Sequence, residues 1–174
     1  MADTVAWRTS LLPIHAYHQL RLVLILAIYS DHKARTRNGM SLKRLAQLDF
    51  LLLNPLLFLH VYPGKYISDG LQGINSGLTL PKDMNVQVLR YAPVINALVS
   101  RELVTARKLR TGTKVILTKH GKIIAAEVQG TLKWAETSQL AALVVSATDG
   151  SKEKEIQQRI DEVLTNKQFD ALIK

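Results

Sequence analysis

The pattern of apolar and polar residues is clearest between residues 90 and 128, where a helical period gives way to two strand-like runs and then returns. Proline favours the first turn of a helix, and Pro93 is followed by an apolar stripe at helical spacing. The stripe comprises Val94, Ile95, Leu98 and Val99. This spacing predicts a helix that begins at Pro93.

Two runs of β-forming residues come next, at 103–109 and 114–118. The four residues between them, 110–113, include Gly112, which can take the positive φ that a tight hairpin requires. Thr118 is placed to cap a following helix, whose inner face is expected to be formed by Ile123, Ile124, Ala126 and Val128. A helix that leads into a two-stranded wing is typical of the second half of a winged helix-turn-helix.

The upstream chain supplies candidates for the first half. Residues 15–29 predict a helix that is apolar nearly all round and is therefore buried on several sides, by its own domain or by a partner. Ser41 is placed to cap a second, leucine-rich helix, which Asn54-Pro55 ends because the residue before proline disfavours the α conformation. Asp49 lies among these leucines, and we expect a structural acid, held by a backbone N–H or an arginine, rather than a catalyst.

The rest of the chain adds a loop and further helices. Residues 60–83 are rich in glycine and proline and predict an extended loop. Amphipathic helices are expected at 132–147 and 152–164. We therefore expect a mainly α fold with a small β-hairpin, divided into a winged-helix domain at 1–130 and a C-terminal helical appendage at 131–174. These last helices either complete the core or lie on a partner.

The apolar helix surface is expected to exceed what one small domain can bury. The side chains predicted to contact a partner protein are therefore taken from the first and last helices. They are Leu22, Ile25, Leu26, Ile156, Ile160 and Val163.

Charge changes this picture by suggesting an anionic partner. The chain has 174 residues and a formal net charge of +9, with its positive excess in 1–45 and 100–122, which favours nucleic acid or an acidic protein surface. In the helix ahead of the hairpin, only Asn96 and Ser100 precede Arg101 as candidates for contacting bases. Two such side chains are too few for direct readout of a base sequence. Contact with a phosphate backbone or with protein is favoured instead. The candidate nucleic-acid-binding residues surround the hairpin tip: Arg107, Lys108, Arg110 and Lys114.

The sequence carries no pattern that calls for catalysis. It has no cysteine, which excludes disulfides and thiolate chemistry. His15 and His18 are three residues apart, but no third ligand stands beside them, so we predict no metal site and no cofactor. The longest apolar run, 22–28, is too short to cross a bilayer, and the N-terminus does not have the pattern of a secretion signal. We expect a cytoplasmic, non-enzymatic protein without membrane contact.

Four segments together carry a family resemblance. RLVLILAIYS (21–30), LKRLAQLDFLLLNP (42–55), RYAPVINALVSRELV (90–104) and VILTKHGKIIA (115–125) resemble, in this order, the middle components of bacterial ABC-three-component defence systems. These are small winged-helix proteins encoded between an SMC- or Rad50-like ATPase and an effector. The small subunit of Lamassu-type anti-phage systems is the most similar of them.

The resemblance implies a non-catalytic subunit that bridges the ATPase and an effector nuclease, with DNA ends or phage replication intermediates as the trigger. The basic hairpin adds the expectation of contact with double-stranded DNA without sequence preference. The alternative is a winged-helix transcription regulator that forms a homodimer through its C-terminal helices. A regulator should be a dimer that binds one specific duplex. A subunit should bind DNA weakly and depend on its partners for stability.

Overall fold

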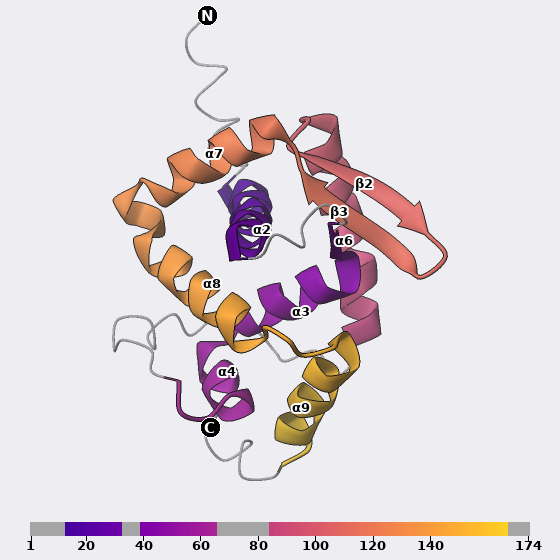
Figure 1. The fold of residues 1–174 in the computed structure, drawn as a ribbon, viewed down its shortest axis with the longest axis vertical. Coiled ribbons are helices and arrows are strands. Elements are labelled where there is room, and N and C mark those ends of the chain that lie inside the picture. Colours follow the sequence, from indigo (N-terminus) through magenta and orange to yellow (C-terminus); the bar gives the residue numbers. More distant parts are fainter. Residues whose placement is uncertain (1–12, 33–38, 66–83, 167–174) are drawn as a thin grey trace, which may run out of the picture.

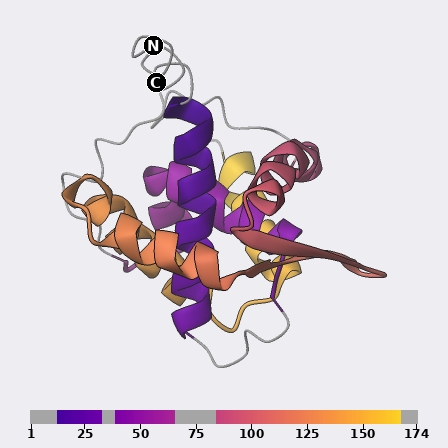
Figure 2. The same ribbon diagram turned by 90° about the horizontal axis from the view of Figure 1, so that it is seen from above.

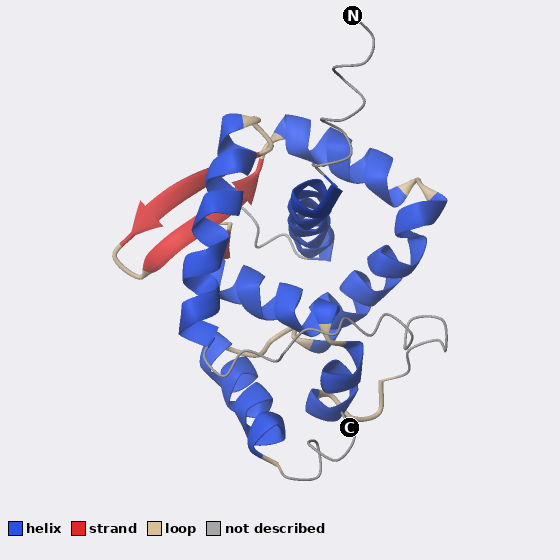
Figure 3. Cartoon of the chain, turned by 180° about the vertical axis from the view of Figure 1, so that it is seen from behind, coloured by secondary structure: helices blue, strands red, loops and turns tan. Residues whose placement is uncertain are grey.

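The computed structural model describes residues 13–32, 39–65 and 84–166. The described chain is mainly helical with a small antiparallel sheet, which confirms the predicted class (Figure 3). In chain order the elements are α2 (Pro13–His32), β1 (Met40–Ser41), α3 (Leu42–Leu53), α4 (Pro55–Val61), α6 (Met84–Ser100), β2 (Val104–Leu109), β3 (Gly112–Leu117), α7 (Lys119–Gln129), the 3-10 helix η2 (Leu132–Trp134), α8 (Ala135–Ala147) and α9 (Glu153–Thr165).

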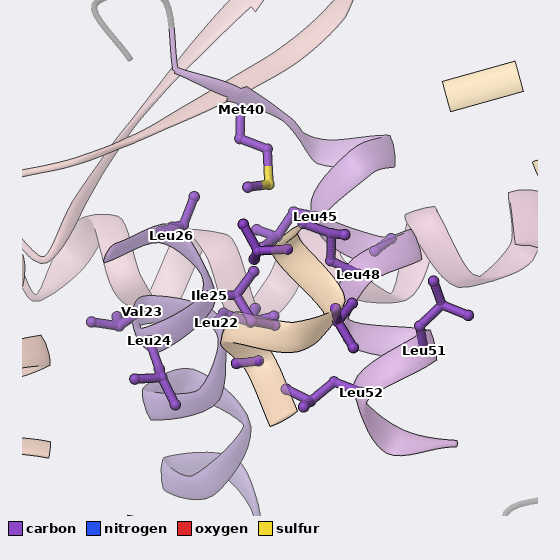
Figure 4. Close-up of a cluster of buried hydrophobic side chains, with 14 of the residues drawn as sticks. Leu22, Val23, Leu24, Ile25, Leu26, Met40, Leu45, Leu48, Leu51 and Leu52 are labelled. Carbon is purple, nitrogen blue, oxygen red and sulfur yellow. The ribbon is translucent and has the colours of Figure 1, made fainter. Parts of the chain in front are cut away.

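The centre of the molecule is α2, which Figure 1 shows end-on with α7, α8 and α3 around it. Every residue from Leu22 to Ala27 is buried, and leucines of α3 face the α2 side chains across the core (Figure 4). The apolar circumference predicted for this helix is therefore covered by the chain itself. The prediction that Leu22, Ile25 and Leu26 contact a partner is wrong, since their exposed fractions are 0%, 1% and 3%.

The sheet has the strand order β1-β3-β2, and both strand pairs are antiparallel. The hairpin of β2 and β3 confirms the prediction, and Gly112 has the expected positive φ of 119°. The turn is shorter than predicted, because Leu109 already pairs with Gly112 and only Arg110 and Thr111 remain between the strands. The third strand, β1, was not predicted, since its two residues are too few for a pattern.

Local signals at the helix ends are confirmed. The Ser41 hydroxyl accepts a hydrogen bond of 3.0 Å from the Arg44 N–H at the start of α3. The Thr118 hydroxyl accepts one of 2.9 Å from the Gly121 N–H at the start of α7. Asn54 separates α3 from α4, as the following proline requires.

Two details of the predicted helices are wrong. α6 begins at Met84, so Pro93 lies inside it rather than in its first turn. Pro93 is exposed, which lets water satisfy the backbone carbonyl that the missing N–H leaves free. In α7 the buried residues are Gly121, Ala125 and Val128, whereas Ile123 is 60% exposed. The contact of α7 with α2 decides this face, and periodicity alone cannot supply it.

The C-terminal helices complete the core instead of forming an appendage. α8 packs against α2 and α3, α9 packs against α3 and α4, and their buried side chains belong to the same apolar cluster as those of α2. Ile156 and Ile160 are fully buried and Val163 is half-buried, so the partner contact predicted for these residues is wrong for the two isoleucines. Arg44 fixes the turn between these helices by donating to the carbonyls of Thr148 and Ser151, at 2.7 Å each.

Of the predicted loop at 60–83, residues 60 and 61 belong to α4, and 66–83 lie outside the described residues. Within the described ranges, no single helix is both long and apolar enough to cross a bilayer. α3 and α4 reach the required length and composition only as a pair, bent by 110°.

Candidate nucleic-acid interface

The hairpin of β2 and β3 projects from the helical body (Figures 1 and 2). At its base, Val104 pairs with Leu117 and both side chains are buried. From Thr105 to Leu109 every residue of β2 is exposed. The core therefore anchors the base of the hairpin, and the outer part is free to meet another molecule.

The structure separates the four candidate cations into three positions. Arg107 pairs directly with Lys114, so the two side chains lie on the same face of the hairpin. Lys108 pairs with Thr113 and lies on the opposite face, because successive residues of a strand alternate. Arg110 lies in the turn. The predicted four-residue turn would instead have placed Leu109 opposite Lys114.

These cations are not neutralised by the described part of the chain. None of the four forms an ion pair with a carboxylate among the described residues. Like charges that are directly opposed destabilise a strand pair, by up to about 1 kcal/mol. The Arg107–Lys114 arrangement is therefore unfavourable unless an anion is bound. The hairpin therefore presents to solvent positive charge that no described carboxylate pairs with.

The helix ahead of the hairpin presents a different surface. Among the described side chains of α6, Leu89 is 76% exposed and Val99 is 40% exposed. The Ser100 hydroxyl donates to the Asn96 carbonyl at 2.9 Å, which occupies one of the two groups expected to face a ligand. Arg101, just after the helix, donates to the side chain of Gln19. Among the described side chains of α6, few hydrogen-bonding groups remain for reading bases, as expected from the sequence.

Arg90 is a surface cation of α6 that the sequence pattern did not indicate. Because the helix was expected to begin at Pro93, Arg90 was placed ahead of it, whereas the structure puts it within α6 and exposed. The helix-compatible residues ahead of Pro93 were the signal that could have revealed this longer helix. Arg90 adds one charge to a mainly apolar helix surface.

A second polar cluster is buried below this surface, around Asp49 of α3. Arg21 of α2 donates to both carboxylate oxygens, with 3.1 Å between Nη2 and Oδ2, and Tyr91 of α6 donates its hydroxyl to Oδ2. His18 Nε2 lies 3.5 Å from the same oxygen. The expectation of a structural acid held by an arginine is confirmed.

The electrostatics of the Asp49 cluster favour the ionised carboxylate. Burial by itself would raise the pKa of Asp49, but the Arg21 charge, the nearby His18 ring and the hydrogen bonds from Arg21 and Tyr91 lower that pKa to about 2. Burial and the neighbouring carboxylate raise the pKa of Tyr91 above its ordinary value, so its hydroxyl stays protonated and donates. The cluster joins α2, α3 and α6 at one point and thereby fixes the helix that carries the hairpin.

Metal ligands are not grouped in the part of the chain that the structure describes. No group of three or more histidine, aspartate or glutamate side chains is placed there to hold a metal ion. His18 instead faces Asp49 and makes a T-shaped contact with the Tyr91 ring, with 5.3 Å between the ring centroids. The side chain of His15 lies outside the described set.

Comparisons of the chain with models of protein families, with curated proteins and with solved structures found no match.

Proposed function

We propose that this chain is a winged-helix protein, with α2, α3 and α6 as its three helices and the β2–β3 hairpin as its wing. The element order supports this assignment, because a short strand after the first helix joins the outer side of the hairpin. α4, between α3 and α6, and the C-terminal helices α8 and α9 are additions around that framework.

The function we propose is that of a non-catalytic subunit that contacts the backbone of double-stranded DNA without reading its sequence. One observation carries this proposal: the hairpin presents four cations that form no ion pair with a described carboxylate, whereas the described exposed residues of α6 include Arg90 as their only cation. Lysine and arginine on a projecting hairpin suit phosphates, which are the same in every sequence. Specific base readout would require several hydrogen-bonding side chains on the helix.

The partner proteins we propose are an SMC- or Rad50-like ATPase and an effector nuclease of a bacterial anti-phage complex. The resemblance of the four segments supports this assignment, but the apolar residues of α2 and α9 no longer do, since they are buried in the core. The exposed apolar side of α6, with Leu89 and Val99, is the surface we assign to protein contact.

The experiment uses the full-length chain and three duplexes of unrelated sequence. Fluorescence anisotropy at several salt concentrations should give dissociation constants that agree within a few-fold, with log K falling linearly against log salt concentration. Co-expression with the products of the neighbouring reading frames should yield a stable complex containing a large coiled-coil ATPase. A homodimer that binds one duplex about 10³-fold more tightly than the others would establish the transcription regulator instead.

A further inference from the structure

Arg107 and Lys114 are directly opposed across the hairpin, and we propose that they form one phosphate site, in which a single phosphodiester of a nucleic-acid duplex lies between both side chains. The inference rests on the proposed function. It specifies how many phosphates these two side chains bind, namely one shared phosphate rather than one each. The ligand class is a phosphodiester in a polymer.

The register of the hairpin supplies the geometry. Directly opposed residues of an antiparallel pair have Cβ atoms about 4.5–5.5 Å apart and point to the same side. The flexible side chains of Arg107 and Lys114 can therefore reach a common point above the strands. Lys108, on the reverse face, and Arg110, in the turn, have no cation opposite them in the pairing.

The charges around Arg107 and Lys114 favour the binding of an anion. Ser41 of β1 pairs with Lys114 on its other side, and its hydroxyl is held by Glu153 at the start of α9. Glu153 forms no ion pair with Lys114, and no other described carboxylate forms one with either cation. Among the described residues, no ion pair relieves the repulsion between the two side chains. An anion shared by both side chains removes this repulsion.

The test counts phosphates through the salt dependence of duplex binding. Each neutralised phosphate of B-DNA contributes about 0.9 to the slope of log K against log salt concentration. If the phosphate is shared, the double variant Arg107→Ala/Lys114→Ala lowers the slope by about 0.9, because only one contact is lost. The ratio of the affinity at 50 mM salt to the affinity at 200 mM salt is then about 3.5-fold smaller than for the wild-type chain.

The matched control removes the same amount of charge from two hairpin positions outside the Arg107–Lys114 pair. Lys108→Ala/Arg110→Ala also removes two cations from the hairpin, but neither has a cation opposite it in the strand pairing, so each is expected to contact its own phosphate. This control variant should lower the slope by about 1.8. Its ratio of affinity at 50 mM salt to affinity at 200 mM salt should be about 12-fold smaller than for the wild-type chain. Melting temperatures of both variants, measured with circular dichroism, verify that the hairpin sequence changes leave the fold intact.

The outcomes separate this inference from the function on which it rests. If the wild-type chain binds duplex and both double variants lower the slope equally, the cations bind separate phosphates; the inference is then overturned and the proposed function stands. If neither double variant changes the slope, the site is absent and the DNA contact lies elsewhere. A wild-type chain that binds no duplex at any salt concentration overturns the proposed DNA contact itself.

Discussion

Arg21 in α2 holds the carboxylate of Asp49 in α3 through two hydrogen bonds, and the side chain of Asp49 is fully buried. Tyr91 in α6 completes the arrangement from the other side. This buried pair joins three helices whose sequences lie far apart, and it sets the position of the helix that leads into the hairpin.

We expect Arg21→Ala to lower the free energy of unfolding by about 3–5 kcal/mol, because it leaves the Asp49 carboxylate buried without its cation. Urea denaturation followed by circular dichroism measures the loss. The double variant Arg21→Met/Asp49→Leu is the control, since replacing both charges with apolar side chains removes the uncompensated charge and should cost much less. A loss below about 1 kcal/mol for Arg21→Ala would show that the pair is not what holds these helices.

Stability should depend on pH through Asp49. Its pKa is lowered from 3.8 to about 2 in the folded chain, so the unfolded chain binds the proton more readily. The ionised carboxylate therefore contributes fully above about pH 5, and roughly 2 kcal/mol is lost as the pH falls through 2. Urea denaturation between pH 7 and pH 2 measures this loss. The same series on Asp49→Asn should lack this component, and an unchanged pH profile in that variant would contradict the assignment.

Gly121→Ala should destabilise the chain by about 1–3 kcal/mol or more, because the new methyl group has no room. A Cβ at this position would lie 2.1 Å from the backbone oxygen of Leu103, which belongs to the segment that opens the hairpin. Thermal unfolding measures the change. Gly130→Ala is the matched control in the same region, where the nearest atoms would be 3.5 Å away, and it should be tolerated. Equal effects of the two substitutions would contradict this explanation.

Charge reversal of all four hairpin cations to glutamate should weaken duplex binding by the complex and flatten its dependence on salt. Anisotropy titrations at 50 and 200 mM salt measure both effects. Melting should change little, because none of the four side chains is buried. Lys43→Glu/Lys154→Glu, at exposed positions on α3 and α9, changes the net charge without touching the hairpin. If that control weakened binding as strongly per charge, net charge rather than the hairpin would explain the result.

Leu89→Ser should leave the melting temperature nearly unchanged, since this side chain is 76% exposed. The same substitution should reduce co-purification with the ATPase that we propose as a partner, because it places a polar group on the apolar side of α6. Leu132→Ser is the control, since Leu132 is 95% exposed on η2, away from that helix. Full retention of the complex by Leu89→Ser would place the protein contact on another surface.

The sequence by itself determined the features that depend on neighbours within a few residues. Ser41 and Thr118 cap their helices because a side-chain oxygen reaches a backbone N–H three positions ahead. Asn54-Pro55 ends α3 for a steric reason that is equally local. The positive φ of Gly112 and the run of hairpin cations could likewise be predicted directly.

Only the tertiary structure decided which surfaces are covered and which side chains meet. The apolar residues of α2 and α9 lie in the core because α8 and α9 fold back over α3, and helix periodicity cannot say what covers a face. Asp49 lies 28 residues from Arg21 and 42 from Tyr91, so its partners follow from helix packing. A turn two residues shorter than predicted shifted the strand register and brought Arg107 opposite Lys114. Pairing across strands depends on the length of the turn that closes them, which the strand pattern left undetermined.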